Sequence, residues 1–278
     1  MVRSIADVLA SARDRLADAA PGSPRREAAL IVAKSLDLSE AKVFAHPELP
    51  VGEAAASRIA GLVERRASGE PFAYLFGERE FWGRPFYVDS RTLIPRPETE
   101  HLVEAALRLS PPEGRLVDVG TGSGCIGITL SLERADLRVF ATDVSPPALA
   151  VADRNRARHR APLGLVAGDL LTPLRPVHID VLVANLPYVS ESELVQSPID
   201  VRDYEPHRAL AGGADGLDVI RRLLAAACGR LAPGAWLLLE IGTAQADAVE
   251  ALGEEYDLRP AERLTDYAGH DRVIVLGV

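Results

Sequence analysis

Four consecutive residues in the second half of the chain have the types needed to bind a planar amide or amino group. They are Asn185, Leu186, Pro187 and Tyr188. The Asn185 side-chain oxygen and the Leu186 carbonyl are two acceptors for an NH2 group, and the following proline favours an extended Leu186. The Tyr188 ring can pack on a flat amide and exclude water. We therefore predict that this tetrapeptide binds the substrate and forms the catalytic centre.

A glycine-rich loop follows an apolar run at residues 115–119. It consists of Gly120, Thr121, Gly122, Ser123 and Gly124. Such a turn between a strand and a helix commonly binds a nucleotide-like cofactor, although it also serves nicotinamide and flavin enzymes, or close packing alone. The Gly-x-Gly-x-Gly spacing suits a pyrophosphate less than it suits S-adenosylmethionine. Together, the loop and the tetrapeptide predict methyl transfer to nitrogen.

Two further acidic positions fit the same cofactor. Asp143 ends the next predicted strand, about twenty residues after the loop, where a carboxylate accepts ribose hydroxyls. Asp169 follows the third strand, where it can meet an adenine amino group while Leu170 covers the ring. We include Asn185 among the residues expected at the cofactor.

The predicted chemistry needs positioning and charge stabilisation. An amide nitrogen is a poor nucleophile because its lone pair is delocalised, so two fixed acceptors must aim that lone pair at the methyl group. Positive charge grows on the nitrogen during an in-line transfer, and prearranged carbonyl dipoles stabilise it. We expect no metal, because the chain has only 2 cysteines and its 6 histidines lack metal-binding spacing.

Composition limits the classes of function. The chain has 278 residues, 47% of them hydrophobic and 26% charged, as in ordinary globular proteins. No apolar stretch is long enough to span a membrane, and the first twenty residues are amphipathic rather than a signal peptide, so we expect a cytoplasmic protein. The net charge of -9 argues against extended nucleic-acid binding. We expect a monomer.

The periodicity of apolar residues divides the chain into three segments. Residues 1–70 have helical spacing after Ser4 and after Ser23-Pro24, and again at residues 53–66, with a stop at residues 21–22. We expect a helical domain that recognises the substrate. Residues 71–97 contain an aromatic, short-period stretch that predicts a β-hairpin linking two domains.

Residues 98–278 alternate strands with helices, which is typical of an α/β, Rossmann-like sheet of parallel strands covered on both faces. The expected strands are 115–119, 138–142, 164–167, 180–184, 235–241, 258–263 and 272–276. The expected helices are 126–133, 146–158, 216–231 and 244–252. Glu98 and Thr99 either cap a helix that runs to Leu107 or shape the cofactor pocket. Cys125 is expected to be a small packing residue, and Arg272 to pair with Asp266.

The chain resembles the class I methyltransferases that modify the glutamine side-chain amide in peptide chain release factors. The resemblance spans nearly the whole chain, and its most specific part is the block Ile94-Pro95-Arg96-Pro97-Glu98-Thr99-Glu100. It also covers residues 118–124, Asp143, Asp169, and residues 185–188, 205–206, 209–210 and 239–242. One position departs from the family pattern Asn-Pro-Pro-Tyr, because Leu186 replaces the first proline. The sequence Asn-Leu-Pro-Tyr is what adenine dimethyltransferases of ribosomal RNA tend to carry.

The resemblance implies an S-adenosylmethionine-dependent enzyme that methylates the glutamine of the Gly-Gly-Gln motif in class I release factors. Two alternatives remain open at this point. One is an amino methyltransferase acting on RNA or DNA bases. The other is an inactive protein that binds the cofactor or a partner, in which residues 185–188 would be only a turn that closes a strand.

Overall fold

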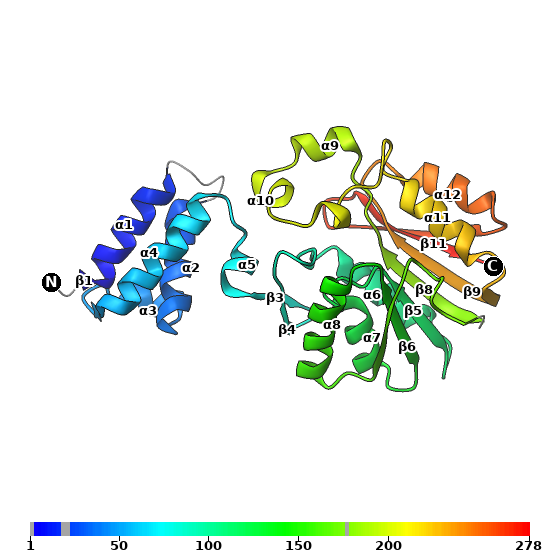
Figure 1. Cartoon of the computed structure of the whole chain (residues 1–278), viewed down its shortest axis with the longest axis horizontal. Helices are drawn as coiled ribbons and strands as arrows, with labels where there is room; N and C mark the ends of the chain where they lie inside the picture. Colours follow the sequence, from blue (N-terminus) through cyan, green and yellow to red (C-terminus); the bar gives the residue numbers. More distant parts are fainter. Residues whose placement is uncertain (1–2, 18–22, 176–177) are drawn as a thin grey trace. The chain divides into compact units, whose positions relative to one another are not determined.

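The protein consists of two compact units. A computed structural model describes residues 3–17, 23–175 and 178–278. The first unit comprises Met1–Phe76 and Ile199–Tyr204, and the second comprises Gly77–Pro198 and Glu205–Val278 (Figure 1). Among the described residues, no helix is long and apolar enough to cross a membrane.

The first unit is mainly helical. Its elements are β1 (Arg3–Ser4), α1 (Ile5–Ala17), α2 (Pro24–Leu36), α3 (Glu40–Ala45), β2 (Pro50–Val51), α4 (Glu53–Ala67), α5 (Phe72–Phe76) and α10 (Ile199–Arg202). Helices α1, α2 and α4 each turn an apolar face inward, and Ile5, Ile31 and Ile59 are buried in their common core. The three helices predicted from apolar spacing are confirmed. The predicted stop at residues 21–22 lies outside the described residues.

The second unit is built on a seven-stranded sheet. Its strands are β5 (Arg115–Val119), β6 (Arg138–Asp143), β7 (Leu163–Ala167), β8 (Ile179–Asn185), β9 (Leu231–Glu240), β10 (Arg259–Thr265) and β11 (Asp271–Gly277). Their spatial order is β10-β11-β9-β8-β5-β6-β7. Each predicted strand is present, and the five from β7 to β9 in this order pair in parallel.

The last two strands depart from the predicted parallel arrangement. Strand β11 pairs antiparallel with both β9 and β10. The turn between β10 and β11, residues 266–270, is too short for the crossover that a parallel pair requires. The sheet is therefore mostly parallel, with an antiparallel hairpin at one edge.

Helices cover both faces of this sheet (Figure 1). One face carries α6 (Thr99–Leu109), α7 (Cys125–Glu133) and α8 (Pro146–His159), and the other carries α11 (Asp218–Ala227) and α12 (Ala246–Glu254). Within β5, Leu116 packs in the core beneath α6 and α7, and Val117 packs in the core beneath α11 and α12. This follows from the alternation of side chains along a strand. Because both faces are buried, the central strands are mainly apolar.

The predicted hairpin forms, but it packs within the second unit. Strands β3 (Glu78–Phe81) and β4 (Arg84–Tyr87) are antiparallel. Phe81 and Phe86 are buried in the core beneath α6 and α7. Asn155 of α8 also accepts from the Tyr87 N–H at 2.7 Å and donates to the Tyr87 carbonyl at 2.9 Å. Residues 77–97 of the expected linker thus belong to this unit, where Phe81 and Phe86 are buried against the sheet's own helices, whereas residues 71–76 belong to the first unit.

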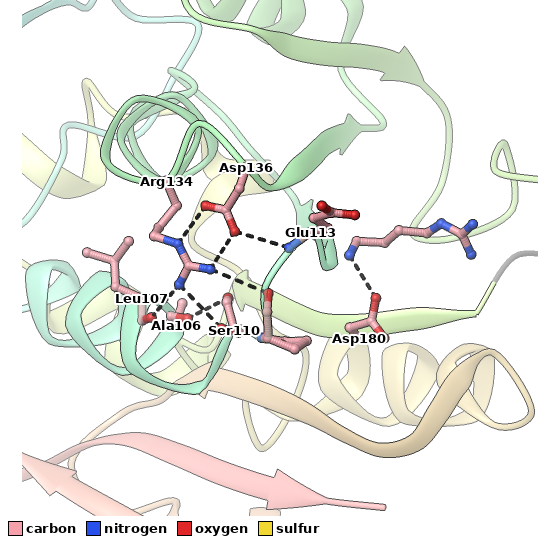
Figure 2. A network of polar contacts seen from close by, with 9 residues as sticks. Ala106, Leu107, Ser110, Glu113, Arg134, Asp136 and Asp180 are labelled. Atoms are coloured by element: carbon pink, nitrogen blue, oxygen red, sulfur yellow. Dashed lines mark hydrogen bonds and ion pairs between the residues drawn. The ribbon is translucent and has the colours of Figure 1, made fainter.

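Arg134, at the end of α7, connects three segments of the second unit (Figure 2). Its guanidinium donates to both carboxylate oxygens of Asp136, at 2.8 and 2.7 Å. It also donates to the carbonyls of Leu107 and Ser110 at the end of α6, at 3.4 and 3.3 Å. Asp136 accepts in turn from the Glu113 N–H at 3.1 Å. These bonds satisfy carbonyl groups that a helix end leaves without partners.

We expect Arg134→Ala to lower the thermal midpoint by about 2–4 °C, because the end of α6 loses its donors. Differential scanning calorimetry measures the change. The control is Arg138→Ala, since the Arg138 side chain is exposed and has no hydrogen bond or ion pair to a described residue. Equal midpoints for the two variants would show that Arg134 contributes nothing beyond an ordinary surface arginine.

Candidate functional site

The carboxyl ends of β5, β6 and β8 border a single cavity of about 500 Å³. Parallel register places these ends together, because Val119 pairs with both Thr142 and Ala184. The lining includes ten of the predicted site residues: Gly120, Thr121, Gly122, Ser123, Asp143, Asp169, Leu170, Asn185, Leu186 and Pro187. Gly124 and Tyr188 are not part of it. The volume is typical of a small-molecule site.

Glycine is required at both ends of the loop for different reasons. Gly120 has φ +75°, and a Cβ there would lie 3.0 Å from Cδ2 of Leu186. Gly124 has φ +84°, and a Cβ there would lie 2.9 Å from Ile128 and 3.2 Å from Ala152. Gly120 therefore lets the loop pass beneath the tetrapeptide, whereas Gly124 lets α7 pack closely on α8.

A buried carboxylate, Asp118, holds the glycine loop from behind. Its Oδ2 accepts from the Thr121 hydroxyl at 2.6 Å and from the Gly127 N–H at 3.0 Å. Burial raises its pKa to about 6, against these two hydrogen bonds. Asp118 belongs to the residues that carry the family resemblance, but it is not among the predicted site residues. Its position inside an otherwise apolar strand is the signal that marks it.

Asp143 lies at the end of β6 with its carboxylate at the cavity. One oxygen accepts from the Gly122 N–H at 2.9 Å and the other from the Ser145 N–H at 2.8 Å. Burial raises the pKa of this carboxyl, while the two backbone donors lower it. Each oxygen keeps a lone pair for a further donor. Asp143 therefore fixes the loop and still presents acceptors to the cavity.

Asp169 and Leu170 lie at another part of the cavity lining. Asp169 forms an ion pair with Arg222 of α11, and both side chains line the cavity. Leu170 is buried with φ +51° and belongs to the core of the sheet. A ligand amino group that approaches Asp169 must share the carboxylate with Arg222.

Asn185 lines the cavity at the end of β8. Its Nδ2 donates to the Thr99 hydroxyl at 3.2 Å, which fixes the direction of the amide. Its Oδ1 has no hydrogen-bond partner among the described residues. Leu186 is only 4% exposed and packs over Gly120. The main chain at Leu186 is thus held at the end of the strand beside an amide acceptor.

The structure places Tyr188 away from the cavity lining. Its ring lies near Gly242, and its carbonyl accepts from Nε2 of Gln245 at 2.9 Å. Burial raises the pKa of its hydroxyl, so this group stays protonated at neutral pH. The expected packing of this ring on a substrate amide remains a prediction.

Of the two alternatives for Glu98 and Thr99, side-chain capping does not occur, and Thr99 lines the cavity. Helix α6 begins at Thr99, and neither residue makes a side-chain capping hydrogen bond at its start. Thr99 is instead buried and accepts from Asn185, which lies 86 positions later in the chain. The long-range partner satisfies this hydroxyl, so the local cap does not form.

A second long-range connection shapes one wall of the cavity. Arg96 forms an ion pair with Glu205, whose other oxygen accepts from the Ile94 N–H at 3.1 Å. This pair joins two blocks that the sequence resemblance includes separately. Arg91, Arg96 and Arg208 all line the cavity, although sequence analysis assigns them no site role. They could not be grouped from the sequence, because Arg208 lies more than 100 positions after the other two.

Two minor expectations are confirmed. Cys125 is buried at the start of α7, and burial raises the pKa of its thiol to about 12, so it packs without forming a thiolate. Arg272 donates to Asp266 at 2.9 Å.

Two family models match the chain. The PrmC N-terminal domain matches residues 7–77, and the methyltransferase small domain matches residues 98–200. The first match coincides closely with the part of the first unit that precedes the hairpin. The second covers the glycine loop and the tetrapeptide.

Proteins with similar sequences and structures agree with these models. The release factor glutamine methyltransferase of Koribacter versatilis is 41% identical over 95% of each chain. That of Nitratidesulfovibrio vulgaris is 44% identical over 96% of this chain and 92% of its own. The structure of the T. thermophilus 16S rRNA N2 G1207 methyltransferase, in complex with AdoMet and guanosine, has a TM-score of 0.51. That enzyme is 16% identical, with 72% of this chain and 49% of its own covered, and so shares the fold alone.

The two release factor glutamine methyltransferases are more than 40% identical to the chain along nearly its whole length, and the chain has the family's N-terminal domain. Its cavity is bordered by a glycine loop and by a strand end with the sequence Asn-x-Pro-Tyr. This chain belongs to the release factor glutamine methyltransferase family.

Proposed function

We propose that this chain transfers a methyl group from S-adenosylmethionine to the side-chain amide nitrogen of the glutamine in the Gly-Gly-Gln motif of class I release factors. The observation that carries this proposal is the Asn185 amide, fixed by Thr99 with its oxygen unpaired at the cavity. The glycine loop borders the same cavity. Cofactor and amide can therefore meet at one place.

The residues at the cavity fit S-adenosylmethionine, which supplies an electrophilic methyl group on a sulfonium. Because a Cβ at position 120 would crowd Leu186, this position holds a glycine, and the glycine has no side chain to keep a cofactor away from the backbone of the loop. Asp143 keeps acceptors for ribose hydroxyls, as argued from its two backbone donors. Leu170 offers an apolar surface for the adenine ring and Asp169 an acceptor for its amino group. We propose these residues, with residues 120–124 and Asn185, as the cofactor site.

The reactive amide would be held by main-chain and side-chain acceptors. Oδ1 of Asn185 and the Leu186 carbonyl would accept from the glutamine NH2, orienting its lone pair toward the methyl group. Both dipoles also stabilise the positive charge that develops on nitrogen. Replacement of the family proline by Leu186 preserves this arrangement, because the backbone supplies the second acceptor.

We further propose that the first unit recognises the protein substrate. It has its own core, and a cavity of about 60 Å³ lies among its described residues, far smaller than the cavity of about 500 Å³ in the second unit. We also propose that the enzyme acts in the cytoplasm as a monomer, and not on nucleic acid, since its net charge of -9 opposes phosphate binding.

Gly120→Ala tests the proposed cofactor loop. The left-handed conformation alone costs an alanine about 1–2 kcal/mol, and crowding against Leu186 adds to this. Gly234→Ala is a matched control, since Gly234 has the same φ of +75° with nothing within 4 Å of its Cβ position. We expect a larger loss of unfolding free energy at Gly120, and weaker S-adenosylmethionine binding by calorimetry in that variant only. Equal cofactor affinities would exclude the loop from the site.

Asn185→Ala tests the proposed amide acceptor. The loss of one prearranged contact of this kind lowers the rate about a hundred- to a thousand-fold. We expect this decrease in single-turnover methylation of a purified release factor when the cofactor is saturating. Leu186→Met, which keeps the carbonyl and nearly the same volume, is expected to methylate at close to the wild-type rate. Near-normal turnover by Asn185→Ala would reject the proposed mechanism.

Removal of residues 1–76 tests the role of the first unit. The truncated protein should bind S-adenosylmethionine as tightly as the full chain, because every residue that lines the cavity belongs to the second unit. It should lose methylation of an intact release factor. Circular dichroism and calorimetric titration establish that the second unit is folded. Methylation at the full rate by such a protein would assign the first unit another task.

A further inference from the structure

Glu240 is a buried carboxyl directly beside Asn185. It ends β9, and in the parallel register Glu240 pairs with Asn185 at the end of β8. The residue is 2% exposed, and its Oε2 has no hydrogen-bond partner among the described residues. It is not part of the cavity lining. It therefore lies behind the proposed acceptor without reaching a ligand.

Packing alone does not account for an acidic residue at this position. Its neighbours Leu238, Leu239 and Ile241 are all buried and apolar, so a leucine would continue the same strand. An unpaired buried carboxylate destabilises a protein unless hydrogen bonds compensate for lost hydration. A functional role explains why the carboxyl is present.

Thr99 connects Glu240 to Asn185. The Thr99 hydroxyl accepts from Nδ2 of Asn185 at 3.2 Å, and it keeps its own proton to donate. Burial raises the pKa of Glu240, and hydrogen bonds from Thr99 and from Asn185 lower it, so that its pKa is about 7. A carboxylate acceptor at Glu240 thus favours the arrangement in which Thr99 receives the Asn185 N–H group.

We propose that Glu240 is a positioning residue, whose carboxylate orders the Thr99 hydroxyl so that the Asn185 amide keeps its oxygen toward the cavity. This inference rests on the proposed function, because it assigns a support to the acceptor that would hold the glutamine amide. Without the carboxylate, the Thr99 hydroxyl can donate to Asn185, and the amide can turn its NH2 group toward the substrate.

Several ionisable groups act on Glu240 from the surrounding elements. Glu98, just before α6, raises its pKa, and Arg272 of β11 lowers it. Burial and the charge of Glu240 both raise the pKa values of Tyr188 and Cys125, so both side chains stay protonated at neutral pH.

Glu240→Leu and Glu240→Gln form the first test. Leucine removes the acceptor but suits the apolar surroundings, so the protein should remain folded. We expect its kcat to fall about 100-fold, as a small misplacement of a catalytic group can cause, with unchanged KM for the release factor and unchanged cofactor affinity. Glutamine keeps an acceptor oxygen and should restore most of kcat. A wild-type kcat for Glu240→Leu, or a glutamine variant as slow as the leucine variant, would overturn the proposal.

The pH dependence provides a second readout. Protonated Glu240 becomes a donor, so kcat of the wild type should decrease as the pH is lowered through about 7. The glutamine variant cannot titrate, and its kcat should stay constant over the same interval. Retention of the same decrease in Glu240→Gln would show that another group is responsible.

Thr99 variants decide the matter if Glu240→Leu does not fold. Thr99→Ser keeps the hydroxyl and should retain kcat, whereas the nearly isosteric Thr99→Val should lose it. Equal kcat values for these two variants would overturn the proposal. In an Asn185→Ala background, Glu240→Gln should leave the residual kcat and its pH profile unchanged, because the three residues act as one unit. An altered profile there would show that Glu240 acts through another group.

These outcomes separate the inference from the proposed function. Full activity of Asn185→Ala would reject the proposed mechanism itself. An inactive Asn185→Ala enzyme, combined with a normal kcat for Glu240→Leu, would reject only the role of Glu240.

Discussion

Parallel pairing of β5, β8 and β9 is the constraint on which the site depends. Strands that run in the same direction end at the same edge, so the groups that follow them must meet there. Register then fixes which groups meet, since Val119 lies opposite Ala184, and Asn185 lies opposite Glu240. The loop at Gly120 and the amide at Asn185 are neighbours for this reason alone.

A consequence is that three acidic groups lie near this edge, where Asp118 and Glu240 are buried and Asp143 is partly buried. Burial raises the pKa of Asp118, Asp143 and Glu240, so each depends on donors that stabilise its charged form. The donors are themselves parts of the site, such as the Thr121 hydroxyl and the Gly122 N–H. The cavity walls are therefore polarised in advance, as preorganised electrostatic stabilisation requires.

The sequence alone predicted every strand of the second unit's sheet and most of the residues that we propose for its site. Apolar runs mark the central strands because both faces of those strands are buried, whereas the edge strand β10 has no buried residue. Site residues in the glycine loop and at Asn185 were predictable because each lies in a compact motif directly after a strand. Helices α3, α5, α9 (Glu191–Gln196) and α10 escaped prediction, since four to six residues are too few to display a helical period.

Only the tertiary structure decided which distant groups act together. It showed the antiparallel edge, the hairpin within the second unit, and the Thr99 hydroxyl bound to Asn185 instead of capping α6. The Arg96–Glu205 pair spans 109 positions, and the Asn185–Glu240 register joins two separate strands. Local sequence patterns report the period of a helix or strand. They carry no information on which buried polar group finds its partner far along the chain.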